Sequence, residues 1–369
     1  SAGRRSSMAD QLGNSINAHY DSVGRLQRMT DKGGSSVVTY TYDATGRVVT
    51  KQLANGVKSN YTYDASDRIT RLENSNASST VLSFMDYKYD LSARISSINT
   101  EDGLWTYTYD AVGQLAQAKF VSVNSSIANQ DLQYFYDAVG NRTRTVLNGN
   151  TTAYTSNDLN EYTNVGAVSY AYDADGNLTS RTQGSNVTKY TYDMENRLVG
   201  IDDGSDIWSY AYDAMGHLAS TTKNGVSRQM TTDPDGIGTI VGEYDASGNL
   251  IARYDYGFRL LRQVDGSGGA SYFTGSDSGN ISELTNAQGT AQATYFYGPF
   301  GDVINSTGNP TDPHRFVGEF GVRAEGPGLY HMRNRFYSPE LGQFLTEDPL
   351  RFIMINNRLY AGNDPIMWI

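Results

Sequence analysis

Large side chains fall at every second position in many short stretches of the chain. In residues 38–42, Val-Thr-Tyr-Thr-Tyr, the valine and the tyrosines share one face of an extended strand and the threonines share the other. This alternation is typical of a β-strand with one buried face. Pairs of tyrosines one residue apart recur along the chain, so the sequence predicts many such strands.

A turn signal follows these strands at a regular interval. The unit reads Tyr-Asp-x-x-Gly-x-Leu, and most copies lie about 20 to 27 residues apart. The ten copies begin at Tyr20, Tyr42, Tyr63, Tyr89, Tyr109, Tyr136, Tyr172, Tyr192, Tyr212 and Tyr244. Two longer intervals each hold a degenerate copy, one at Tyr154 and one at Thr232.

The chemistry of one unit explains its pattern. Asp43 can accept hydrogen bonds from nearby backbone N–H groups, and Gly46 suits a position with positive φ. Seven copies have Gly at that position, and Asp67, Asn196 and Ala93 replace it in the others. Asp and Asn tolerate the left-handed region, whereas Ala is the exception. Each copy therefore predicts a bulged β-hairpin.

We expect the hairpins to form one long antiparallel sheet that coils, because strands twist with a fixed hand. The predicted fold class is all-β: a coiled array of antiparallel β-hairpins that forms a partial shell or barrel. The tyrosines should stack from one hairpin to the next as a ladder. With 28 Tyr but only 38% hydrophobic residues, the apolar layer should be thin and aromatic.

Composition narrows the range of partners. A net charge of -11 and the lack of a Lys and Arg cluster disfavour binding to nucleic acid. The absence of Cys excludes disulfides, and no apolar stretch approaches the roughly 18 residues of a membrane span. The first residues lack the apolar centre of a signal peptide, so we expect any export signal to lie outside this sequence.

The sequence predicts no cofactor and no metal. Residues 173–177, Asp-Ala-Asp-Gly-Asn, begin like a calcium loop, but Leu178 and Gly184 stand where an EF-hand needs Gly and Glu. The four His have no second ligand at metal-binding spacing. Trp105 and Trp208 lie in strand patterns, which favours buried positions over sugar-binding ones.

The repeated unit resembles the YD repeats of bacterial Rhs and wall-associated proteins, of the B and C components of insecticidal toxin complexes, and of teneurins. Residues 335–349, Arg-Phe-Tyr-Ser-Pro-Glu-Leu-Gly-Gln-Phe-Leu-Thr-Glu-Asp-Pro, closely resemble the Rhs repeat-associated core. The resemblance predicts an N-terminal extension in residues 1–15, a YD-repeat β-hairpin array in residues 16–255 and an Rhs-associated core in residues 256–369 that closes the array.

In that family the repeats form a hollow β-shell around an unfolded C-terminal toxin, and the core can act as an aspartyl autoprotease. The resemblance implies catalytic roles for Asp348, at the core Asp-Pro position, and for Arg335, which would hold its carboxylate. Ser338 stands where many members have a further Asp. Asp364, where Asn is common, is either a compensating acid or a turn residue. The segment that family members cut is expected after Ile369.

Two functions follow as hypotheses. The first is a structural scaffold of a bacterial Rhs-type polymorphic toxin, secreted or at the cell surface, whose partner is a toxin domain in cis. Further partners could be a secretion system, a cell surface or a glycan. The alternative is an adhesin or carbohydrate-binding module without proteolysis. Relatives that enclose a toxin are several times longer, so about ten repeats form either the closing end of a larger shell or a small relative with another use.

Overall fold

The computed structural model describes residues 3–308, 312–349 and 356–367. A 29-stranded sheet contains most of these residues, and each strand pairs antiparallel with the next one along the chain. The described part contains no α-helix. The predicted all-β array of hairpins is therefore confirmed.

The strands of the large sheet are β1 (Ser7–Ala9), β2 (Ser15–Tyr20), β3 (Leu26–Asp31), β4 (Ser36–Tyr42), β5 (Val48–Leu53), β6 (Lys58–Tyr63), β7 (Ile69–Ser75), β8 (Val81–Tyr89), β9 (Ile95–Thr100), β10 (Gly103–Tyr109), β11 (Leu115–Ser122), β12 (Gln130–Tyr136), β13 (Arg142–Leu147), β14 (Asn150–Ser156), β15 (Tyr162–Val165), β16 (Val168–Tyr172), β17 (Leu178–Gln183), β18 (Asn186–Tyr192), β19 (Leu198–Asp202), β20 (Ile207–Tyr212), β21 (Leu218–Lys223), β22 (Val226–Thr232), β23 (Ile240–Asp245), β24 (Leu250–Tyr256), β25 (Leu260–Asp265), β26 (Ala270–Gly275), β27 (Ile281–Thr285), β28 (Ala291–Tyr297) and β29 (Val303–Thr307). A small second sheet and two 3-10 helices follow: β30 (Arg323–Ala324), β31 (Tyr330–Met332), β32 (Arg335–Ser338), β33 (Gln343–Phe344), η1 (Gly318–Phe320) and η2 (Ala361–Asn363).

The YD units form the predicted turns. The Asp43 carboxylate accepts a hydrogen bond from the backbone N–H of Arg47 at 3.0 Å. Gly46 has a φ of 95°, and the ladder shifts register beside Tyr42, which is the predicted bulge. Ala93, the one exception to the turn pattern, also adopts a positive φ, of 63°. The turn therefore keeps its geometry even where Ala replaces Gly.

The tyrosines of the YD pairs connect neighbouring hairpins, but the predicted ring stacking is wrong. Tyr63 donates its hydroxyl to the carbonyl oxygen of Val48, at 2.7 Å. The guanidinium of Arg47 lies 4.6 Å from the centroid of the Tyr63 ring and also pairs with Asp43 of its own turn at 2.6 Å. Among the described residues, ring contacts between tyrosines involve other positions. An arginine lies over seven of the ten YD tyrosine rings, those of Tyr20, Tyr42, Tyr63, Tyr89, Tyr109, Tyr172 and Tyr212, where a stacking neighbour would otherwise lie.

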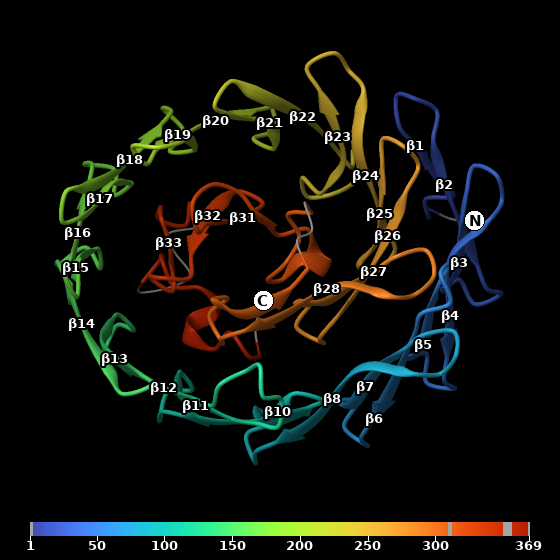
Figure 1. Ribbon diagram of the computed structural model, residues 1–369, viewed down its shortest axis with the longest axis horizontal. Coiled ribbons are helices and arrows are strands. Elements are labelled where there is room, and N and C mark those ends of the chain that lie inside the picture. Colours follow the sequence, from blue (N-terminus) through green and yellow to red (C-terminus); the bar gives the residue numbers. More distant parts are fainter. Residues whose placement is uncertain (1–2, 309–311, 350–355, 368–369) are drawn as a thin grey trace.

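The sheet curves into a ring whose ends overlap. Figure 1 shows the first strands, in blue, lying outside the orange strands β25–β27 on one side of the ring. Val38 of β4 and Leu261 of β25 belong to one buried apolar cluster at this overlap. At the seam, Arg5 pairs with Asp233 at 2.5 Å. The wall is thus closed by side chains where strand pairing ends.

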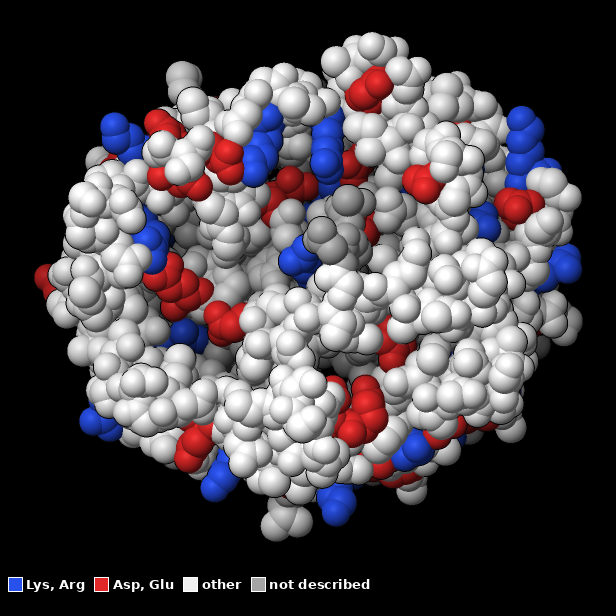
Figure 2. Space-filling model, in the orientation of Figure 1, with Lys and Arg blue, Asp and Glu red and all other residues white. Residues whose placement is uncertain are grey.

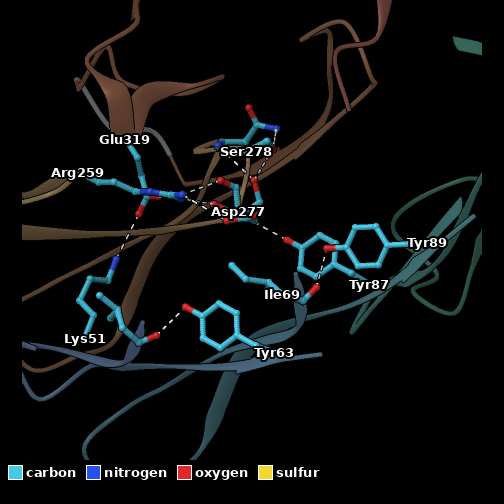
Figure 3. Close-up of polar contacts among 12 residues, drawn as sticks. Lys51, Tyr63, Ile69, Tyr87, Tyr89, Arg259, Asp277, Ser278 and Glu319 are labelled. Carbon is cyan, nitrogen blue, oxygen red and sulfur yellow. Dashed lines mark hydrogen bonds and ion pairs between the residues drawn. The ribbon is translucent and has the colours of Figure 1, made fainter. Parts of the chain in front are cut away.

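A buried charge network holds the inner turn of the spiral against the wall. Figure 3 shows Lys51 of β5 facing Glu319 of η1, with Nζ and Oε1 3.3 Å apart. The second oxygen of Glu319 lies 3.0 Å from Arg259, which also binds Asp277. The backbone N–H of Asp277 donates to the hydroxyl of Tyr87 in β8. Ion pairs and hydrogen bonds therefore join the wall to a layer more than 170 residues later in the chain.

The C-terminal residues occupy the middle of the ring. Figure 1 places β31–β33 there, surrounded by the wall. Phe336, Leu341 and Leu345 pack in one cluster with wall residues of β16–β21, among them Tyr210. No helix in the described part of the chain is long and apolar enough to cross a membrane.

Candidate functional site

The three candidate catalytic residues line one cavity of about 1120 Å³. Arg335, Asp348 and Asp364 reach it from the C-terminal segment, while the wall contributes Arg94 and Val112 from two YD turns. The cavity is therefore bounded by the core on one side and by the repeat array on the other.

Arg335 holds the Asp348 side chain. A guanidinium nitrogen of Arg335 lies 2.6 Å from a carboxylate oxygen of Asp348. The guanidinium also donates to the carbonyl oxygen of Asn357 at 3.2 Å and lies 3.7 Å from the centroid of the Phe344 ring. The backbone N–H of Asp348 donates to the same Asn357 carbonyl, at 3.0 Å. These contacts fix the orientation of the pair, as a bound carboxylate requires.

Asp364 differs from Asp348 in its surroundings. Its side chain is buried, and one carboxyl oxygen has no hydrogen-bond partner among the described residues. Burial raises the pKa of Asp364 to about 6, and backbone N–H groups of Ile366 and Met367 and the charge of Arg94 offset part of that effect. Its backbone N–H donates to Ala361, so the residue also forms part of a turn. Its carboxyl can remain protonated under mildly acidic conditions.

Ser338 does not reach this cavity. It lines a second cavity of about 850 Å³, beside Glu340 and Arg181 of the wall. Its hydroxyl oxygen accepts a hydrogen bond from the backbone N–H of Leu341. A carboxylate at the position of Ser338 would therefore not face Asp348 through the cavity described above.

The structure also places the other residues that the sequence singled out. Trp105 and Trp208 are buried in the wall, with 5% and 8% of their surface exposed, and so cannot stack on a sugar. Trp368 lies outside the described residues. No group of three or more His, Asp or Glu side chains in the described part of the chain is arranged to hold a metal ion.

Charges of both signs border the space between wall and centre. On the face in Figure 2, Lys and Arg side chains alternate with Asp and Glu side chains around the hollows. The second cavity repeats this mixture, since Arg228 and Arg315 line it together with Asp203 and Glu325. A surface of mixed sign does not provide the continuous positive potential that a nucleic-acid backbone needs.

Two contributions to the site were not apparent in the sequence. Phe344 lies in the predicted core, but its ring contact with Arg335 depends on the pairing of β32 with β33. Arg94 follows the YD turn that has Ala93 at its Gly position, and this exception in the sequence did not indicate that the core would face this turn. The resemblance predicted Arg335 and Asp348 because their motif is local.

Comparison with known proteins places the chain among YD-repeat proteins. The model of the teneurin YD-shell family matches residues 78–366, and the RHS repeat model matches residues 20–58. The tRNA nuclease WapA of Bacillus subtilis (strain 168) is 27% identical over 252 residues, which cover 64% of this chain and 10% of WapA. The double-stranded DNA deaminase toxin A of Burkholderia cenocepacia (strain H111) is 25% identical over 311 residues, covering 77% of this chain and 20% of the toxin.

Solved structures share the fold at low sequence identity. A chain of the Photorhabdus luminescens Tc holotoxin pore with a TccC3 variant superposes with a TM-score of 0.81 at 18% identity, over 98% of this chain and 20% of that one. A TcdB2-TccC3 crystal structure gives a TM-score of 0.70 at 18% identity, over 97% and 21%. The chain thus spans between a tenth and a fifth of the length of these relatives.

Proposed function

Because the chain belongs to the teneurin YD-shell family, we propose that it is a shell scaffold of an Rhs-type toxin, with the repeats as wall and the C-terminal segment as the core that closes it. The supporting observation is the core lying inside the ring and meeting the YD turns around a cavity that contains Asp348. In this proposal residues 1–15 are an extension, 16–255 the array and 256–369 the core.

Cavity size bears on where a cargo would lie. Three cavities among the described residues have volumes of about 1120, 940 and 850 Å³. A domain of about 100 residues has a radius of gyration near 13 Å and so occupies on the order of 10⁴ Å³. None of these three cavities could enclose such a domain. We therefore propose that the ring forms the closing end of a longer shell, with the toxin held beyond it.

The names of the relatives support a carrier role. One is named as a tRNA nuclease and another as a double-stranded DNA deaminase toxin. Two different activities accompany a similar stretch of repeats, which points to a common scaffold with interchangeable cargo. We propose a toxin domain in cis as the main partner, and a secreted or cell-surface location with a secretion system as a further partner.

We propose that Asp348, Arg335 and Asp364 of the core carry out self-cleavage. In the proposed reaction the Asp348 carboxylate, held by Arg335, takes a proton from a water molecule as the water oxygen bonds to the scissile carbonyl carbon. The protonated carboxyl of Asp364 gives its proton to the leaving amide nitrogen as the C–N bond breaks. The products are a carboxylic acid and an amine. Asp348 thus acts as the general base and Asp364 as the general acid, because the surroundings of the two carboxyl groups differ.

The test uses the chain extended beyond Ile369 by an Asp-Pro-x-Gly-Leu segment and a C-terminal tag. Mass spectrometry should reveal one cut in that segment, and Asp348→Asn should slow it by about a hundredfold or more, because an amide cannot accept the proton. Asp364→Asn should slow the cut as well if this residue is the acid. Asp302→Asn, in the second cavity, is the control and should leave the rate unchanged. An uncut wild-type chain would rule out self-cleavage.

A further inference from the structure

One YD-type turn in the wall has a neutral residue at the Asp position and an acid at the Arg position. In the ordinary turns an Asp is followed four residues later by Arg or a neutral side chain, and pairs such as Asp193 with Arg197 lie 2.7 Å apart. In the degenerate copy the Asp position is Asn157 and the Arg position is Glu161. The turn still closes, because the Asn157 side chain accepts the backbone N–H of Glu161 and donates to its carboxylate at 2.6 Å.

Glu161 is the one acid at its position among the described turns that begin with Asp or Asn and in which the first backbone N–H donates to the carbonyl of the fifth residue; a related turn that begins with Gly298 has Asp302 there. The corresponding residues of the other Asp and Asn turns are Asn14, Arg25, Ser35, Arg47, Arg68, Thr80, Arg94, Gln114, Asn141, Asn177, Arg197, His217, Asn249, Gly269 and Thr290. An isolated acid in the interior of the ring would be costly to bury. Its exposed fraction is only 3%, so it must have a partner.

That partner comes from the core. A guanidinium nitrogen of Arg358 lies 3.3 Å from the Glu161 carboxylate, and Arg358 is 1% exposed. The same guanidinium donates to the carbonyl oxygen of Gly176, in the next turn of the wall, and to the carbonyl oxygen of Leu345 at 3.3 Å. Arg358 therefore joins two adjacent wall turns to the core.

Arg358 also lies next to the strand that leads to the candidate catalytic residue. Its carbonyl oxygen accepts the backbone N–H of Phe344 at 3.0 Å, and its guanidinium is 3.9 Å from Glu347. The preceding residue, Asn357, accepts hydrogen bonds from both Asp348 and Arg335. A displacement of Arg358 would therefore move the groups that hold the Asp348 side chain.

We propose that the Glu161–Arg358 pair fixes the register of the core on the repeat array and so positions Asp348. The consequence for cleavage rests on the proposed function; the consequence for docking does not. The array presents many hairpins that share one turn geometry, so a charge found at one of them can mark a position on the wall. The turns with Arg at this position would repel Arg358, whereas Glu161 offers it a carboxylate. Selecting one register is the best-attested use of a buried ionic group.

The experiment is a double-mutant cycle with Arg358→Met, Glu161→Gln and both together. Hydrogen exchange at Phe344 and Leu345 in the 369-residue chain reports docking, and cleavage of the extended chain reports positioning. Arg358→Met should accelerate exchange and slow cleavage by about tenfold, because it leaves a buried carboxylate without its cation. Adding Glu161→Gln should restore part of the protection from exchange and part of the cleavage rate, because the buried carboxylate without a partner is gone. Arg197→Met, the same substitution in a wall turn where Arg197 contacts Asp193, Glu195 and the ring of Tyr212, is the matched control.

The outcomes separate the two proposals. If the wild-type extended chain is not cut but exchange still shows partial rescue, self-cleavage fails and the docking role of the pair stands. If the wild-type chain is cut and the effects of the two substitutions are simply additive in exchange and cleavage, the pair does not set the register. The same conclusion follows if Arg197→Met disturbs Phe344 as much as Arg358→Met does.

Discussion

Gly176 and Gly216 occupy the same position of two YD turns and share a left-handed backbone, with φ values of 82° and 84°. Their surroundings differ. A Cβ on Gly176 would lie 2.7 Å from the Arg358 guanidinium, whereas a Cβ on Gly216 would meet no atom within 4 Å. Gly176 therefore serves both the turn and the contact with the core.

Substitution of each glycine by Ala separates these two demands. Both variants should lose about 1–2 kcal/mol for placing an L-residue in the left-handed region. Gly176→Ala should lose about 1–3 kcal/mol more, because the added methyl displaces the buried Arg358. Urea denaturation of the two variants measures the difference. Equal midpoints would mean that the core adapts to the methyl group without cost.

At this scale the sequence predicts local chemistry well and distant contacts poorly. The positive φ of Gly46 and the Asp43 hydrogen bonds follow from four or five adjacent residues. Arg358 was not predicted, because its partner Glu161 lies 197 residues earlier in the chain. An acid at the Arg position of the degenerate copy, Glu161, could have indicated this contact. A degenerate repeat is usually interpreted as one that has lost its pattern.

Tyrosine hydroxyls connect neighbouring hairpins of the wall. Tyr212 donates its hydroxyl to the carbonyl oxygen of Leu198 at 2.6 Å, whereas the buried hydroxyl of Tyr192 has no hydrogen-bond partner among the described residues. Tyr212→Phe should therefore lower the free energy of unfolding by about 1 kcal/mol. Tyr192→Phe, the matched control, should leave it unchanged or raise it. Thermal unfolding measures both, and an unchanged stability in both would show that ring packing, not the hydroxyl, connects the hairpins.

The hairpin itself could be predicted, but the way hairpins join could not. Alternation, turn residues and bulge all lie within one unit, as in residues 38–47. The contact between two units depends on where each tyrosine ring lies relative to the next hairpin. The twist of the sheet sets this position. Arg47 then occupies the space over the Tyr63 ring that a stacking neighbour would need.

At the scale of the whole molecule, buried charge pairs join distant parts of the chain. The pairs Lys51–Glu319, Glu161–Arg358 and Glu243–Arg323 each connect the wall to the later, inner segment. Such pairs add little net stability compared with well-packed apolar residues, but breaking one leaves a buried charge without its partner. Arrangements of core on wall that separate these pairs are therefore penalised.

Glu243 makes this dependence measurable as a function of pH. Its carboxylate lies 2.7 Å from Arg323 and accepts a hydrogen bond from the hydroxyl of Tyr254 at 2.6 Å. Burial raises the pKa of Glu243, but the charge of Arg323 and these hydrogen bonds lower it further, to about 2. The unfolded chain, with an ordinary Glu pKa of about 4.3, binds the proton more readily than the folded chain does. The stabilisation by Glu243 is therefore complete above about pH 4.3 and disappears as the pH falls towards 2.

Comparison of the wild-type chain with Glu243→Gln isolates this group, since buried acids away from Arg323, such as Glu283, whose pKa burial raises, are common to both. At pH 7 the variant should be less stable by about 3 kcal/mol, because the buried Arg323 loses one of its two carboxylate partners and keeps Glu325, at 3.0 Å. Urea denaturation at successively lower pH should show this difference shrinking between about pH 4.3 and 2. A difference that stays constant over that range would mean that Glu243 acts through its shape, and that core and wall are held in place by packing alone.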